Sequence, residues 1–178
     1  RKAAARSFVL LKKDQNVLPI DKKAKIALIG PLGNNQSNMP GTWAPTGDFK
    51  NAIPVLEGLK NVAPKASITY AKGANITNDE QMAKNVNVFG PKVEISEESP
   101  EELLAEALKV AKDADVIVAA VGEASEMSGE ASSKTDLLIP ESQKVLCPYL
   151  ECRRERSFYI PFLKPMPCVD FVWVISGL

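Results

Sequence analysis

The chain has 178 residues, of which 45% are apolar, so it can bury the core of one globular domain but is too short for a barrel of about 250 residues. Its 22 Lys and Arg residues balance its 22 Asp and Glu residues, and without a basic excess we expect no nucleic-acid partner. It contains no histidine, which excludes an imidazole-activated serine or cysteine nucleophile, and we expect neither a metal nor a cofactor.

The first half of the chain predicts one helical lead-in, one strand and one amphipathic helix. Residues 1–11 are rich in Ala and form the lead-in. Residues 24–30 are a short β-rich run ended by Gly-Pro, which is typical of a strand buried on both faces of a parallel sheet. A loop rich in Gly, Asn, Pro and Ser follows, with Trp43 in its middle. Residues 51–62 then have apolar side chains at every third position, which predicts a helix.

The second half continues the alternation of strands and helices. Residues 66–70 alternate in polarity and predict a strand, whereas the twenty or so residues after Asn78 carry weak signals and are expected to be mainly loop with possible helical turns. Ser99-Pro100 is a strong helix start, and residues 116–122 are the clearest buried strand in the chain. The pattern predicts a doubly wound α/β fold with right-handed crossovers.

Glutamates follow the strand at residues 116–122, where a parallel sheet would bind a ligand. Sheets of this class place ligands beyond the carboxyl ends of their strands, which selects the loop with Trp43 and the loop at residues 122–139. The second loop carries Glu123, Glu126 and Glu130. A carboxyl group there can serve as a general acid if burial raises its pKa, or as a base or nucleophile if it stays ionised. The pattern alone does not distinguish such groups from solvated surface glutamates.

We interpret residues 1–146 as one domain. The tail at residues 147–178 differs from this domain in composition. It holds all three cysteines, and their odd number leaves at least one thiol without a partner in the chain. Prolines and a cluster of Glu and Arg residues accompany them, although residues 169–175 could form a strand. Two interpretations stay open: an irregular C-terminal extension, or a sequence that arises from cloning or from a frameshifted reading of the gene.

Several stretches of the chain match, in combination, a known family of enzymes. The matching stretches are residues 4–12, 16–19, 25–31, 41–43, 56–61, 70–75, 118–123 and 127–136. Through them the chain resembles the α/β-sandwich domain that follows the barrel in family 3 glycoside hydrolases, especially the periplasmic bacterial β-glucosidases. The resemblance covers about four fifths of the chain and implies a three-layer α/β/α sandwich with a mainly parallel sheet.

The same resemblance implies the activity of a retaining β-glucosidase, which hydrolyses terminal β-D-glucosyl residues of β-glucosides or oligosaccharides. In that family a barrel domain supplies an Asp nucleophile and the second domain supplies the acid/base Glu, which corresponds to Glu130. A retaining enzyme needs two carboxyl groups about 5 Å apart, one of which donates and then accepts a proton. Glu123 corresponds to a residue at the strand end with a structural role. Trp43 corresponds to an aromatic residue that lines the sugar site, and core packing is its alternative role.

The chain also departs from the family. The barrel and its nucleophile are absent, so the isolated chain is expected to be weakly active or inactive. After Gln143 the family pattern is lost, which predicts a truncated sheet with an exposed apolar edge and therefore a homo-oligomer. Two alternatives are kept: a non-catalytic, self-associating binding module, and an esterase-type hydrolase that uses Ser128 or another serine.

Location is predicted from the start of the chain and from the resemblance. No apolar run approaches the roughly 18 residues of a membrane span, so no span is expected. The first residues are not those of a signal peptide, and the start looks internal to a longer protein. The resemblance implies a periplasmic or secreted location.

Overall fold

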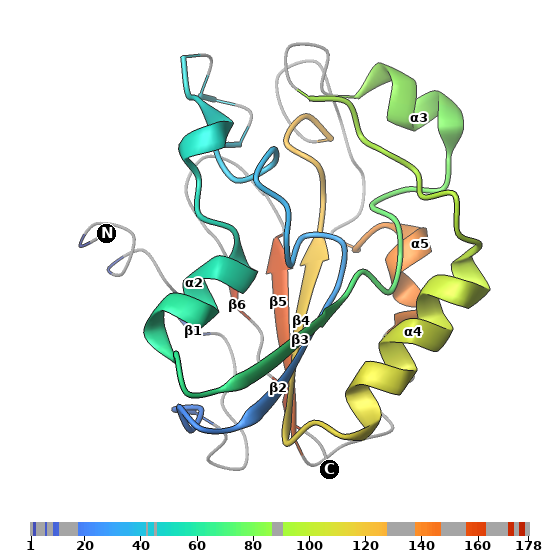
Figure 1. Ribbon diagram of the computed structural model, residues 1–178. Helices are drawn as coiled ribbons and strands as arrows, with labels where there is room; N and C mark the ends of the chain where they lie inside the picture. Colours follow the sequence, from blue (N-terminus) through green and yellow to red (C-terminus); the bar gives the residue numbers. More distant parts are fainter. Residues whose placement is uncertain are drawn as a thin grey trace.

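Five parallel strands form the centre of the fold in the computed structural model of the chain (Figure 1). The structure describes residues 2, 6, 18–41, 43–44, 46–86, 91–127 and 138–146 and, as backbone alone, four further strands. The main elements are β2 (Lys25–Ile29), α2 (Val55–Val62), β3 (Ser67–Ala71), α3 (Glu80–Asn85), α4 (Pro100–Lys112), β4 (Val116–Gly122) and α5 (Glu141–Lys144). The backbone strands are β1 (Val9–Leu10), β5 (Arg156–Phe162), β6 (Phe171–Val172) and β7 (Ile175–Ser176).

The order of the strands across the sheet is β3-β2-β4-β5-β7, so the predicted doubly wound arrangement is confirmed. The chain goes from β2 to its neighbour β3 and then crosses back to β4 on the other side of β2. In register, Ile26 of β2 faces Ile68 of β3 on one side and Val116 of β4 on the other. The direction of winding therefore reverses between β2 and β4, and the loops that follow these two strands diverge at the carboxyl edge of the sheet.

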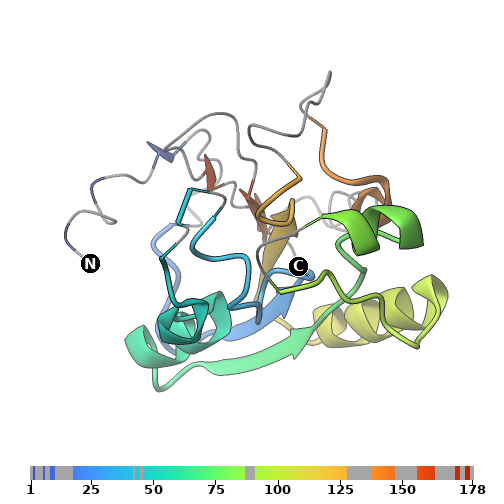
Figure 2. The same cartoon turned by 90° about the horizontal axis from the view of Figure 1, so that it is seen from above.

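Helices cover both faces of the sheet and make three layers (Figure 2). The side chains of Ile26 and Leu28 point to one face of the sheet, and α2 packs against this face. On the other face Ala27 and Ile29 lie in a second core cluster with Ala107 of α4. Because both faces are buried here, strands β2 and β4 are apolar at nearly every position, as predicted for residues 24–30 and 116–122.

The two long helices begin where the local sequence dictates. Ser99 caps α4: its Oγ accepts from the N–H of Glu102 at 3.2 Å, and the Glu102 carboxylate accepts from the N–H of Ser99 at 2.8 Å. Helix α2 begins at Val55, four residues later than predicted, and residues Phe49–Asn51 form a 3₁₀ turn instead. The reason is Pro54, whose ring disfavours a helical conformation in the residue before it.

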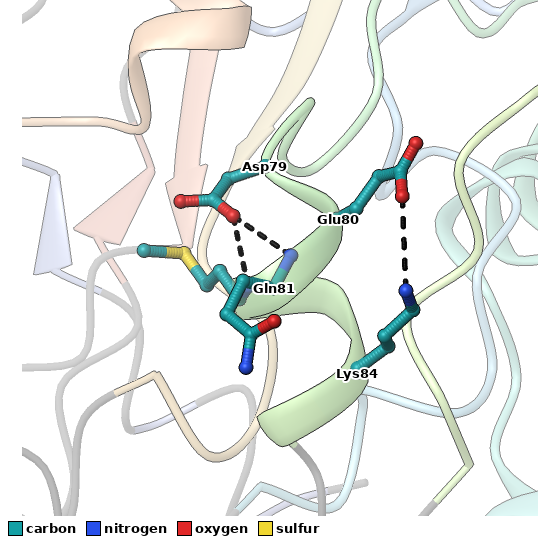
Figure 3. A network of polar contacts seen from close by, with 5 residues as sticks. Asp79, Glu80, Gln81 and Lys84 are labelled. Carbon is teal, nitrogen blue, oxygen red and sulfur yellow. Dashed lines mark hydrogen bonds and ion pairs between the residues drawn. The ribbon is translucent and has the colours of Figure 1, made fainter.

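Helix α3 lies in a segment that was predicted to be mainly loop with possible helical turns (Figure 3). The carboxylate of Asp79 accepts from the N–H groups of Gln81 at 2.8 Å and Met82 at 3.0 Å, which satisfies two donors of the first turn. Lys84 and Glu80 are one turn apart, 3.7 Å between Nζ and Oε2, and both are exposed. A cap therefore holds this six-residue helix, and no hydrophobic periodicity marks it in the sequence.

Strands at both ends of the chain differ from the predictions. Strand β5 was not predicted, and it pairs with the whole length of β4 from Ile117 to Gly122. The exposed apolar edge expected of a truncated sheet is therefore not at β4, because β5 pairs with it there. Strand β1 lies within the predicted helical lead-in, where pairing with β6 overrides a weak local preference for helix. None of the helices in the described part of the chain is long and apolar enough to cross a membrane.

Candidate active site

The loop after β2 crosses the end of β4 at very close range. Gly30 ends β2 with a φ of 127°, and a Cβ atom built on it would lie 2.1 Å from the carbonyl oxygen of Ala120. Two residues later, the N–H of Leu32 donates to that same oxygen at 3.2 Å. Only glycine accommodates both the left-handed conformation and the contact, so the sequence brings this loop onto β4 through Gly30.

The loops after β2 and β4 are then joined by hydrogen bonds. The N–H of Ser125 donates to Oδ1 of Asn38 at 2.7 Å, and the Ser125 hydroxyl donates to the carbonyl oxygen of Asn38 at 3.3 Å. Asn38 is itself held, because its N–H and Nδ2 donate to Oδ1 of Asn35 at 2.9 and 3.0 Å. These are the two loops that were predicted to bind a ligand, and they meet in one corner at the carboxyl edge of the sheet (Figures 1 and 2).

The glutamates of the β4 loop lie in different surroundings. Glu123 directly follows β4 and is buried at 7% exposure, and its structural role stays a prediction. Glu126 is half-buried. Residues 128–137 lie outside the described part, and with them Glu130, the predicted acid/base residue, and Ser128, the serine of the esterase alternative. What the structure describes of this loop is its first part, from Glu123 to Met127.

Trp43 lies in the loop after β2 and is 62% exposed. That exposure excludes core packing within this chain, which was the alternative to a sugar-binding role. Met39 and Ile53, at 39% and 55%, are also exposed on the connection between β2 and α2. An exposed aromatic ring can stack on the apolar face of a sugar ring, and the sugar-binding role of Trp43 stays a prediction.

A second polar cluster follows β3 at the same edge of the sheet. Lys72 Nζ donates to Asn75 Oδ1 at 2.8 Å and to Ser96 Oγ at 2.6 Å. Burial lowers the pKa of Lys72, and Glu98 and Glu94 oppose this shift. Asn75 is only 2% exposed, and its side chain is engaged on both sides, since its Nδ2 donates to Asn78 Oδ1 at 2.9 Å. This cluster is an internal anchor for the loop after β3, with its polar groups directed at one another.

Sequence reasoning missed two amide side chains that support the site. Asn38 joins the two loops, and Gln143, fully buried on α5, holds the backbone of Gly122. The hydrogen-bond partners of Asn38 and Gln143 lie 87 and 21 positions away in the sequence. Sequence spacing therefore gives no signal for either contact. Among the described residues, no three His, Cys, Asp or Glu side chains are grouped so as to hold a metal ion.

Comparison with known proteins connects most of the chain to an enzyme family. A model of the glycosyl hydrolase family 3 C-terminal domain matches residues 8–151. A periplasmic beta-glucosidase of Salmonella typhimurium is 44% identical over 147 residues, which are 82% of this chain and 19% of the relative. A beta-xylosidase of Formosa agariphila is 31% identical over 150 residues, 80% of this chain and 18% of the relative.

A solved structure agrees with these relatives. The beta-glucosidase of Listeria innocua in complex with glucose matches with a TM-score of 0.62 at 28% identity, and the match covers 86% of this chain and 18% of that one. The chain therefore spans less than a fifth of the length of each of these relatives.

Proposed function

Because the chain belongs to the glycosyl hydrolase family 3 C-terminal domain family, we propose that it supplies one half of a retaining β-glucosidase active site, with Glu130 as the acid/base residue. The observation that carries the proposal is the corner where Ser125 bonds Asn38. It brings the start of the loop with Glu130 beside the loop with Trp43, at the reversal point of the sheet where doubly wound folds bind ligands.

The chemistry assigns Glu130 two successive roles. Its protonated carboxyl group donates a proton to the glycosidic oxygen while a second carboxylate attacks the anomeric carbon from the opposite face of the sugar. The leaving alcohol departs and a covalent glycosyl-enzyme intermediate remains. The ionised Glu130 then accepts a proton from water, which attacks the anomeric carbon and releases the sugar. We propose that the nucleophile is an Asp of a barrel domain outside these 178 residues, so the chain alone hydrolyses β-glucosides weakly or not at all.

The substrate is proposed from the relatives and from Trp43. The relative at 44% identity is named a beta-glucosidase and the one at 31% a beta-xylosidase, which favours a terminal β-D-glucosyl residue over a xylosyl residue. Trp43 offers an exposed ring for the apolar face of that sugar. The name of the nearer relative also supports a periplasmic or secreted location.

Hydrolysis of aryl glycosides by a longer form that includes a barrel domain tests the proposal. Glu130→Ala should lower kcat for an aryl β-glucoside by about 10²–10⁴-fold, the usual contribution of a general acid/base. Glu126→Ala, a glutamate of the same loop, is the matched control and should leave kcat within a few-fold. Equal losses in both variants, or an unchanged kcat for Glu130→Ala, would remove Glu130 from the role. A preference for the xyloside would overturn the substrate alone.

A second candidate is a non-catalytic module that self-associates. It is favoured by the apolar side chains of Trp43, Ile53 and Leu138, each more than half exposed. Sedimentation over a range of concentrations distinguishes it: association that Trp43→Ser abolishes would support this candidate, and a strict monomer would reject it.

A further inference from the structure

Gln143 is a polar side chain with no exposed surface, placed where the core would accept an apolar one. Its Oε1 accepts from the N–H of Gly122 at 2.8 Å, and its Nε2 donates to the carbonyl oxygen of Gly122 at 2.7 Å. The same Nε2 donates to the carbonyl oxygen of Ile76 at 3.1 Å. A buried amide is costly without partners, and here the acceptor and both donor hydrogens are used.

The side chain of Gln143 binds the backbone of β4 beyond the point where the pairing of β4 with β2 has ended. The register between β2 and β4 stops at Ile29 and Ala119, three residues before Gly122. Gln143 then engages both backbone polar groups of Gly122, as a residue of a neighbouring strand would. Three residues beyond Gly122, Ser125 bonds Asn38. Two amide side chains from different elements therefore hold the two ends of the segment from Gly122 to Ser125.

We infer that Gln143 is a positioning residue for the active-site loop, which fixes the direction in which the loop leaves β4 on its way to Glu130. Through Ile76 it also ties this loop to the segment after β3, next to Ser142, whose hydroxyl lies 2.9 Å from the same carbonyl oxygen. The functional meaning of this role rests on the proposed function of Glu130, whereas the hold on Gly122 does not.

Two substitutions separate positioning from simple core filling. Gln143→Met keeps the length and volume of the side chain and removes all three hydrogen bonds. Gln143→Glu is more specific: its protonated carboxyl group can accept from Gly122 N–H and donate to one carbonyl oxygen, whereas its ionised form cannot donate and faces two carbonyl oxygens. The exposed Gln81→Met on α3 is the matched control.

Amide hydrogen exchange of the full 178-residue chain, followed residue by residue by NMR, is the test. In Gln143→Met, the protection factors of Gly122 and Ser125 should fall by about 10-fold or more, while those of Leu28 in β2 and Ala107 in α4 stay as in Gln81→Met. In Gln143→Glu, protection at Gly122 should approach that of the parent chain at low pH. It should fall as the carboxyl group ionises, because the carboxylate can no longer donate and is repelled by the carbonyl oxygens of Gly122 and Ile76.

The opposite outcomes are equally definite. Unchanged protection at Gly122 in Gln143→Met, or an equal fall at Leu28 and Ala107, would overturn the inference. If Gln143→Met does not fold, Gln143→Glu decides alone, and protection at Gly122 that is independent of pH would overturn it. Because the readout is protection at Gly122, it stays separate from the hydrolysis that tests Glu130.

Discussion

The N–H of Ser125 donates to Oδ1 of Asn38 at 2.7 Å although 87 positions separate the two residues. The bond closes the corner between the loops after β2 and β4. Asn38→Ala should lower the free energy of unfolding by about 1 kcal/mol and expose the Ser125 amide to exchange. Urea denaturation and amide exchange measure the two effects. Asn61→Ala, on the exposed surface of α2, should change stability by less than about 0.5 kcal/mol. An equal effect of the two substitutions would contradict the corner's role.

Gly30 and Gly58 form a matched pair of glycines with opposite expectations. Gly30→Ala would place a Cβ atom 2.1 Å from the carbonyl oxygen of Ala120 at a φ of 127°. It should lower the free energy of unfolding by about 2–3 kcal/mol. A Cβ atom at Gly58, within α2, meets nothing within 4 Å. Gly58→Ala should therefore raise the free energy of unfolding by about 0.5–1 kcal/mol, since alanine favours the helix. Thermal unfolding of both variants checks the pair, and the reverse order would be inconsistent with the close crossing.

Tyr70 should make stability fall in alkaline solution. Burial, aided by the charge of Glu106, raises the pKa of Tyr70 to about 12 from 10.0. Because the folded pKa is raised, the unfolded chain loses the proton first, and the stabilisation is complete below pH 10 and lost as the pH rises through 12.

Urea unfolding of the parent chain and of Tyr70→Phe between pH 8 and pH 12 measures this effect. The variant lacks the bond from the Tyr70 hydroxyl to the Gly30 carbonyl oxygen, 3.3 Å long, and should be less stable at pH 8. The difference between the two proteins should shrink above pH 10. A constant difference across the range would show that Tyr70 does not cause the alkaline loss.

Helix α3 depends on its cap more than on its ion pair. Asp79→Ala leaves the N–H groups of Gln81 and Met82 without their acceptor and should cost about 1 kcal/mol, with faster exchange at Ala83. Glu80→Ala removes only an exposed pair with Lys84 and should cost less than about 0.5 kcal/mol. Urea unfolding and amide exchange compare them. If Glu80→Ala were the more damaging change, the cap would not be what holds the helix.

Local patterns in the sequence predicted the inner sheet and α4, but not the elements that depend on distant partners. Strand β4 is an apolar run and α4 begins with a capping box, so both can be identified from neighbouring residues alone. Strand β5 contains Pro161 and follows a cluster of charged residues, and its pairing with β4 decides its conformation. The contact of Gln143 with Gly122 likewise joins residues distant in the sequence, so sequence spacing does not predict it. Glu130 and Trp43 came from the family pattern and stay predictions as to their roles.

The product formed in the presence of azide tests the central claim about Glu130 most directly. Azide needs no general base, so in Glu130→Ala of the longer form it should attack the glycosyl-enzyme intermediate from the face that water uses. The account predicts faster turnover of an activated aryl β-glucoside and a glucosyl azide of β configuration, identified by NMR, with none from Glu126→Ala. A glucosyl azide of α configuration, or turnover of Glu130→Ala that azide leaves unchanged, would contradict the assignment of Glu130 as the acid/base residue.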